Sequence, residues 1–195
     1  MSTAELVRER IEEAPLRSFI ETADLPGSRR AVECELSRLV AKGEVVRVRR
    51  GLYWKGPRTR IGMPLPRGFD VGMAIAGPGA GPASLSAAAF LGLTTQVPAL
   101  YTIAVPGRSP VAPPGVRFVS RSIERRILGL EPAEVAVLEV LRNGAAAIEA
   151  PWADFAEAVA RLETDRVIRP SLITEQLGNE RHVAARERWS DLARA

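Results

Sequence analysis

Residues 28–55 read SRRAVECELSRLVAKGEVVRVRRGLYWK and decide how the N-terminal part of this 195-residue chain folds. Ser28 is a favourable N-cap and Gly43 is a typical helix stop, so we expect a helix over residues 29–42. At about 100° per residue, one side of this helix is apolar, formed by Val32, Leu36, Leu39 and Val40. The opposite side is short or basic, formed by Arg30, Cys34, Ser37 and Ala41. A helix of this kind packs one side on a core and leaves the other side open to a partner.

The second half of the same stretch has the alternation of a β-hairpin. Apolar Val46 and Val48 alternate with basic residues, Arg50-Gly51 can form a turn, and residues 52–54 can return as a strand. We expect the apolar side of this hairpin to pack on the helix. The arginines are expected to face solvent, namely Arg47, Arg49 and Arg50. Tyr53 and Trp54 are expected to anchor the hairpin to the core.

The residues before this stretch complete a small domain. Ser2 and Glu5 have the spacing of a capping box, and Pro15 should stop the helix that starts there. Residues 22–25 can form a second, short helix. Two helices, a third long helix and a hairpin, in this order, predict a winged helix-turn-helix domain over residues 1–57 and hence binding to double-stranded DNA.

Charge supports a polyanionic partner for this region. Residues 28–60 hold ten basic and three acidic residues, whereas residues 127–195 hold eight arginines and twelve acidic residues. Basic surfaces of this density attract nucleic acid. The alternative is a solvated surface, because the chain uses arginine in place of lysine throughout (25 Arg, 2 Lys).

Candidate DNA-contacting residues lie at the start of the helix, on its open side and on the hairpin. They are Ser28, Arg29, Arg30, Ser37, Arg47, Arg49 and Arg50. The first turn of a helix can reach base edges or hold a phosphate through its free N–H groups. Long basic side chains on a hairpin suit phosphate or minor-groove contacts, which give affinity with a steep salt dependence.

The rest of the chain predicts a second domain with both helices and strands. Residues 58–79 are rich in Gly, Pro and Arg and suggest a linker or extended arm, which leaves 80–195 as the C-terminal domain. We expect strands over 100–105 and 116–120 in a small sheet, and a helical end. The predicted helices are 83–93, 132–142, 151–164, 170–176 and 179–193. The fold class is therefore α+β, a winged helix-turn-helix followed by a mixed C-terminal domain.

A second set of basic residues lies in this C-terminal part. It comprises Arg117, Arg121, Arg125 and Arg126. Such a patch can contact DNA beside the hairpin, an acidic face of a protein partner, or a nucleotide bound to that partner. The sequence leaves these three alternatives open.

No complete catalytic constellation is present, so we expect neither an enzyme nor a cofactor or metal site. The glycines at 77 and 79 suggest a dinucleotide-binding turn, but the third glycine position is Pro82 and no acidic residue follows at the required distance. His182 is the single histidine, and a hydrolytic triad would depend on it alone. The single Cys34 suits a reducing cytoplasm, and no apolar run is long enough to cross a membrane.

Two segments together resemble a known family. The long helix followed by GEVVRVRRGLY, and the downstream segment PASLSAAAFLGLTTQVPALYTIAVPGR, are similar to AbiEi-type antitoxins in order and spacing. The two segments cover roughly residues 28–55 and 82–108.

This resemblance implies an antitoxin of a bacterial toxin–antitoxin system. Its N-terminal domain would bind inverted repeats in its own promoter and repress the operon, as a monomer or a dimer on DNA. Its C-terminal domain would counter an AbiEii-like nucleotidyltransferase toxin, with or without direct contact. The DNA-contacting residues carried over from the family are Ser28, Arg29, Arg30, Arg47, Arg49 and Arg50. The alternatives are a protein–protein inhibitor and another transcriptional regulator without toxin contact.

Overall fold

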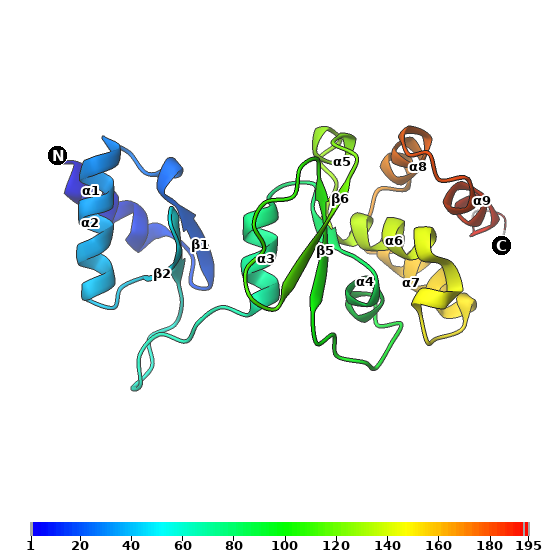
Figure 1. The fold of residues 1–195 in the computed structure, drawn as a ribbon, viewed down its shortest axis with the longest axis horizontal. Helices are drawn as coiled ribbons and strands as arrows, with labels where there is room; N and C mark the ends of the chain where they lie inside the picture. Colours follow the sequence, from blue (N-terminus) through cyan, green and yellow to red (C-terminus); the bar gives the residue numbers. More distant parts are fainter. Residues whose placement is uncertain (1, 193, 195) are drawn as a thin grey trace. The chain divides into compact units, whose positions relative to one another are not determined.

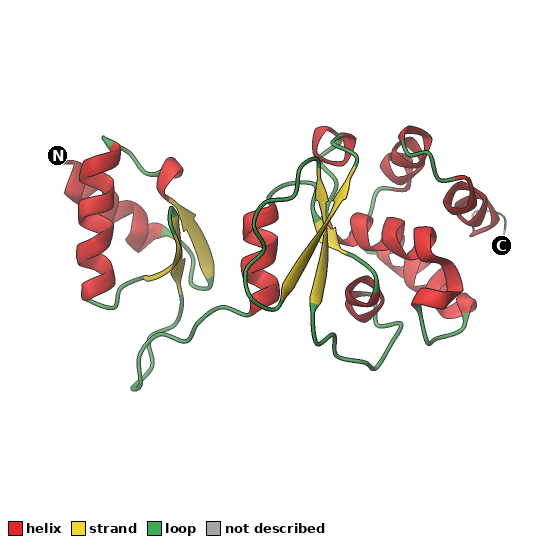
Figure 2. Ribbon diagram, viewed as in Figure 1, coloured by secondary structure: helices red, strands yellow, loops and turns green. Residues whose placement is uncertain are grey.

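The chain forms two compact units, which we describe separately. In the computed structural model, which describes residues 2–192 and 194, the first unit is Met1–Arg67 and the second is Gly68–Ala195. Both contain helices and strands, so the predicted α+β class is confirmed (Figures 1 and 2).

The first unit packs two helices against a three-stranded antiparallel sheet. Its elements are α1 (Thr3–Glu13), β1 (Ser18–Glu21), the 3-10 helix η1 (Thr22–Asp24), α2 (Arg29–Ala41), β2 (Val46–Arg49) and β3 (Leu52–Lys55). The strand order is β1-β3-β2, so β3 is central. The core between sheet and helices consists of Val7, Ile11, Ile20, Leu25, Val32, Leu36, Leu39, Val45 and Tyr53.

The sequence signals at the ends of α1 are confirmed. Ser2 and Glu5 form the predicted capping box, in which the Glu5 N–H donates to Ser2 Oγ at 3.3 Å and the Ser2 N–H donates to Glu5 Oε2 at 2.6 Å. The helix ends at Glu13, two residues before Pro15, because proline lacks the N–H that another turn needs. The predicted short second helix is η1, a single 3-10 turn.

Helix α2 begins where the sequence predicts and ends one residue earlier, at Ala41, but its buried side differs. The N–H of Ala31 donates to Ser28 Oγ at 3.4 Å, and Gly43 adopts φ +66° after the last turn. The prediction that Val40 belongs to the core is wrong, because its side chain is 36 % exposed. The core side is rotated toward α1, which packs against α2 and buries Glu35 instead.

The second unit has a small mixed sheet between helices. Its strands are β4 (Gly81–Pro82), β5 (Tyr101–Pro106) and β6 (Val116–Arg121), in the order β4-β5-β6. The two predicted strands pair, and they are parallel. Alternate side chains of β5 enter two cores. Ile103 and Val105, with Val116 of β6, pack with α3 (Gly68–Ala76). Ala104 packs with α4 (Leu85–Phe90) and α6 (Pro132–Asn143).

The remainder of this unit is helical, as the sequence predicts. Its helices after β4 are α4 (Leu85–Phe90), α5 (Glu124–Ile127), α6 (Pro132–Asn143), η2 (Gly144–Ala147), α7 (Trp152–Thr164), α8 (Pro170–Asn179) and α9 (Val183–Leu192). Helix α6 is buried over almost its whole length and forms the centre of this core (Figure 1).

The predicted linker needs a correction. Residues 68–76 lie inside the proposed 58–79 linker, yet they form α3 and belong to the second unit. Their apolar residues recur at helical spacing and pack on β5, which outweighs the glycines that suggested a linker. The unit boundary therefore lies between residues 67 and 68, and 58–67 belong to the first unit.

Candidate nucleic-acid interface

The β2–β3 hairpin presents its arginines as the sequence predicts. Arg50 and Gly51 connect the strands, and Gly51 adopts φ +81°, a conformation that favours glycine. Three arginines of the hairpin are exposed: Arg47 and Arg49 on β2, and Arg50 in the turn. The returning strand β3 is buried, since Leu52, Tyr53 and Trp54 are each at most 7 % exposed.

Trp54 anchors the hairpin, as predicted. Its ring packs on Phe19 of β1 with centroids 4.9 Å apart, and its Nε1–H donates to the Pro64 carbonyl at 3.1 Å. A Cβ at Gly56 would lie 2.4 Å from Trp54 Nε1, so only glycine fits at this point. The indole is therefore occupied and does not serve as a stacking platform.

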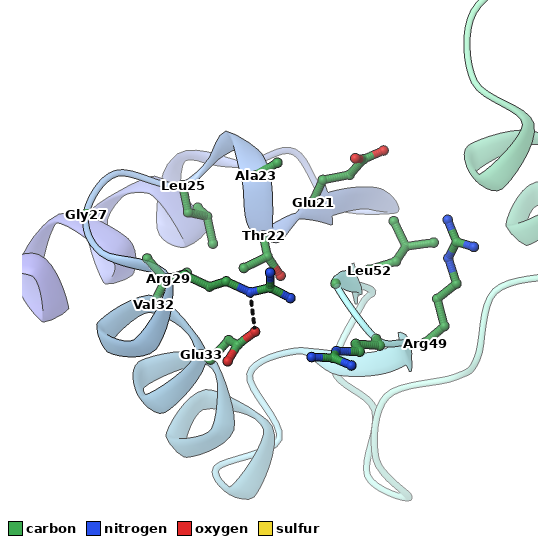
Figure 3. Close-up of a pocket in the computed structure, with 12 residues that line it drawn as sticks. Glu21, Thr22, Ala23, Leu25, Gly27, Arg29, Val32, Glu33, Arg49 and Leu52 are labelled. Carbon is green, nitrogen blue, oxygen red and sulfur yellow. Dashed lines mark hydrogen bonds and ion pairs between the residues drawn. The ribbon is translucent and has the colours of Figure 1, made fainter.

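A pocket of about 540 Å³ lies between the hairpin turn, η1 and the start of α2 (Figure 3). Three arginines from two elements line it: Arg29, Arg49 and Arg50. Its other walls include Thr22, Val32 and Leu52 and two carboxylates, Glu21 and Glu33. The pocket brings the predicted helix residue Arg29 together with two of the predicted hairpin residues, Arg49 and Arg50, but not with Arg47.

Arg29 already has a partner in this pocket. Its Nε donates to Glu33 Oε1 at 3.0 Å, one helical turn along α2, and the Arg29 side chain is 73 % exposed (Figure 3). An exposed pair of this spacing contributes only a few tenths of a kcal/mol. A stronger anionic ligand can therefore replace Glu33.

The other predicted residues of α2 are not all equally available. Arg30 is exposed and Cys34 is an exposed free thiol. Ser28 caps the helix, and the Ser37 hydroxyl donates to the Glu33 carbonyl at 2.8 Å. Both serine hydroxyls are therefore already engaged in hydrogen bonds with the backbone of α2.

Glu35 forms ion pairs with two arginines, Arg8 of α1 and Arg38 of α2. The sequence pattern did not single out this residue. Its carboxylate is 1 % exposed and accepts from Arg8 Nε at 2.6 Å and from Arg38 Nη1 at 3.0 Å. The hydrogen bond from Arg8 lowers the pKa of Glu35 below its usual value, assisted by Arg38 and opposed by burial. The three-residue spacing of Glu35 and Arg38 was readable in the sequence, whereas Arg8 is 27 residues away.

Two of the four arginines in the predicted second basic patch are not available at the surface. Arg125 is fully buried, where it pairs with Glu139 at 2.9 Å and with Glu180 at 2.7 Å. Arg121 donates through two nitrogens to Glu139, each at 2.7 Å. Both side chains neutralise buried carboxylates, so only Arg117 and Arg126 of this set remain exposed.

Of the two glycines that suggested a dinucleotide-binding turn, Gly79 has a packing role, because a Cβ there would lie 2.6 Å from Arg126 Cα. A Cβ at Gly77 would meet no atom within 4 Å. Among residues 2–192 and 194, no group of three or more His, Cys, Asp or Glu side chains is placed to hold a metal ion. None of the helices within these residues is long and apolar enough to cross a bilayer.

Comparisons with known proteins find a similar solved structure but no matching sequence family. No protein-family model matches the chain, and no curated protein sequence matches it. Among solved structures, it is similar to the crystal structure of the Rv2827c protein from Mycobacterium tuberculosis. The identity is 19 %, the TM-score is 0.44, and the match covers 97 % of this chain and 75 % of that one.

Proposed function

We propose that the first unit is a winged helix-turn-helix that binds double-stranded DNA, with α2 as the recognition helix and the β2–β3 hairpin as the wing. The observation that carries this proposal is the clustering of Arg29, Arg49 and Arg50 around one pocket at the start of α2. Arginines from a helix start and a hairpin tip suit two adjacent contacts on a DNA backbone.

The exposed side of α2 fits the same role. Arg30, Cys34, Ser37 and Ala41 are exposed along the helix, and all except Arg30 are small. A helix with a shallow outer side can enter the major groove, which is about 12 Å wide. In this arrangement Arg30, in the first turn, is the residue that reaches a base edge or a phosphate.

We further propose that the protein is the antitoxin of a toxin–antitoxin system and represses its own operon. Support comes from the resemblance of residues 28–55 and 82–108 to AbiEi-type antitoxins. On this proposal, the second unit counters a nucleotidyltransferase-like toxin, and the protein itself catalyses no reaction.

The test of DNA binding is a mobility shift with the gene's own upstream region at two salt concentrations. Replacing Arg47, Arg49 and Arg50 by Ala in the full chain should weaken binding to every duplex. It should also reduce the slope of log affinity against log salt by about 0.9 for each phosphate that the variant no longer neutralises. Unchanged binding by this triple variant would refute the wing assignment.

A second candidate function is toxin inhibition without DNA binding, which the separate second unit permits. Coexpression with the neighbouring toxin distinguishes the two. If repression and neutralisation use different units, the triple variant loses repression and still protects the cell. Protection by a wild-type protein that shifts no DNA would favour the inhibitor.

A further inference from the structure

We infer that the pocket between η1, α2 and the wing holds one backbone phosphate of the DNA, with Thr22 as an additional ligand and Glu33 as a stand-in anion in the free protein. This inference rests on the proposed function and names residues that determine the affinity of the protein for DNA.

The first observation is an unpaired hydroxyl. Thr22 lines the pocket, and its Oγ1 is buried without a hydrogen-bond partner among the residues that the structure describes. A buried polar group without a partner costs stability, so native proteins keep few of them. Rotation of the Thr22 side chain about its Cα–Cβ bond toward the pocket would let this hydroxyl donate to a phosphate oxygen there.

The second observation is how Thr22 is held. Its N–H donates to the Gly51 carbonyl at 2.9 Å, which ties η1 directly to the tip of the wing. A Cβ at Gly51 would lie 3.9 Å from Thr22 Oγ1. The backbone of Thr22 is therefore fixed next to the turn that carries Arg49 and Arg50.

The third observation is the charge balance of the pocket. Three arginines and two carboxylates, Glu21 and Glu33, line it, and Glu33 neutralises Arg29 through a 3.0 Å contact. Arg29 lies in the first turn of α2, where free N–H groups also favour an anion. A phosphate that enters the pocket would replace Glu33 as the partner of Arg29, and Glu33 would then oppose binding by repulsion.

The experiment measures the affinity of the full chain for a duplex of its own upstream region by fluorescence anisotropy. Thr22→Val removes the hydroxyl and keeps the shape of the side chain. It should weaken binding about ten- to a hundredfold, the range for one hydrogen bond to a charged group. Its melting temperature should not fall, because the hydroxyl has no partner in the free protein. A purely structural Thr22 would give a lower melting temperature and unchanged affinity.

Glu33→Gln tests the stand-in anion. It should strengthen binding several-fold at low salt, with a smaller gain at high salt because salt screens the repulsion. The matched control is Glu9→Gln on the exposed side of α1, which removes the same charge away from the pocket and should have less effect.

Arg47→Ala separates this inference from the proposed function, because Arg47 belongs to the wing and does not line the pocket. If Arg47→Ala weakens binding while Thr22→Val and Glu33→Gln leave it unchanged, the phosphate site is wrong and DNA binding stands. If the wild-type chain binds no duplex, the proposed function itself fails.

Discussion

Arg125 and Glu139 form an ion pair in the second unit in which both side chains are fully buried, with Nη1 and Oε1 2.9 Å apart. Arg121 joins the same carboxylate, and Glu180 joins Arg125 to Arg142. The network connects β6, α5, α6 and the segment after α8. It explains why a stretch that appears basic in the sequence offers little basic surface in the fold.

Removing one member of this network should strongly destabilise the second unit. Glu139→Ala leaves Arg125 buried without this partner, and breaking a buried pair in this way typically costs about 3–5 kcal/mol. The measurement is urea unfolding followed by the fluorescence of Trp152 and Trp189, which lie in this unit.

The control is an ion pair of the same chemical type at the surface. Arg194 and Asp191, in the same unit, are 3.3 Å apart and both at least 70 % exposed. Asp191→Ala should change the free energy of unfolding by less than about 1 kcal/mol. Equal effects of the two substitutions would contradict a structural role for the buried network.

Acid should destabilise the first unit through Glu35. The pKa of Glu35 is lowered in the folded protein, first by the hydrogen bond from Arg8. Its unfolded value is about 4.3, so the carboxylate contributes its full stability above that pH. The contribution is lost as pH falls from the unfolded value through the lowered, folded-state pKa, because in this range the unfolded state binds a proton that the folded state does not.

Thermal unfolding between pH 7 and pH 3 checks this dependence. Glu35→Gln should lower the melting temperature most at neutral pH, and the difference from the wild type should shrink below about pH 4. Glu9→Gln, at an exposed position on α1, serves as the control. A difference that stays constant across this range would show that the charge of Glu35 is not the cause.

Local signals in the sequence were sufficient for most of the first unit. The capping box at Ser2, the N-cap at Ser28 and the alternation of valine and arginine in β2 each depend on residues within four positions, and all were predicted correctly. The pocket could be anticipated only in part. Arg29, Arg49 and Arg50 were predicted, but Thr22 is brought beside them by the hydrogen bond to Gly51, 29 residues further along the chain.

The errors arose where distant segments decide burial. Val40 and Glu35 lie on opposite flanks of the apolar stripe of α2, and the packing of α1 determines which flank is covered. Arg125 appears exposed in a basic run because its partners, Glu139 and Glu180, follow 14 and 55 residues later. Composition cannot reveal such pairs, because the residue type alone does not tell whether an arginine is exposed or buried.

Lys55 should prove to be a structural rather than a DNA-binding cation. Its Nζ donates to three carbonyls at the end of α1, those of Ile11 at 2.7 Å, Glu12 at 2.7 Å and Ala14 at 2.6 Å. The last carbonyls of a helix lack intrahelical donors and carry partial negative charge, so an ammonium group there is favourable. Lys55→Met should lower the free energy of unfolding of the first unit by about 1–3 kcal/mol.

Lys42 provides the comparison, because it is an exposed lysine in the same unit at the end of α2. Lys42→Met should leave the stability of the unit nearly unchanged. In DNA-binding assays Lys55→Met should keep the wild-type salt slope as long as the protein remains folded. A slope reduced by about 0.9 would instead assign Lys55 to a phosphate.

Ser84 should gain stability on replacement by glycine. It precedes α4 with φ +52° and ψ −134°, a conformation that L residues rarely adopt, and its side chain makes no capping hydrogen bond. Backbone strain of this kind costs about 1–3 kcal/mol. Glycine adopts the same angles without a Cβ clash but loses more entropy on folding, so Ser84→Gly should raise the free energy of unfolding by about 1 kcal/mol. Ser84→Ala keeps the Cβ and should leave stability close to wild type, as measured by the same urea titration. If alanine stabilised the unit as much as glycine, the hydroxyl and not the backbone would be the source of the strain.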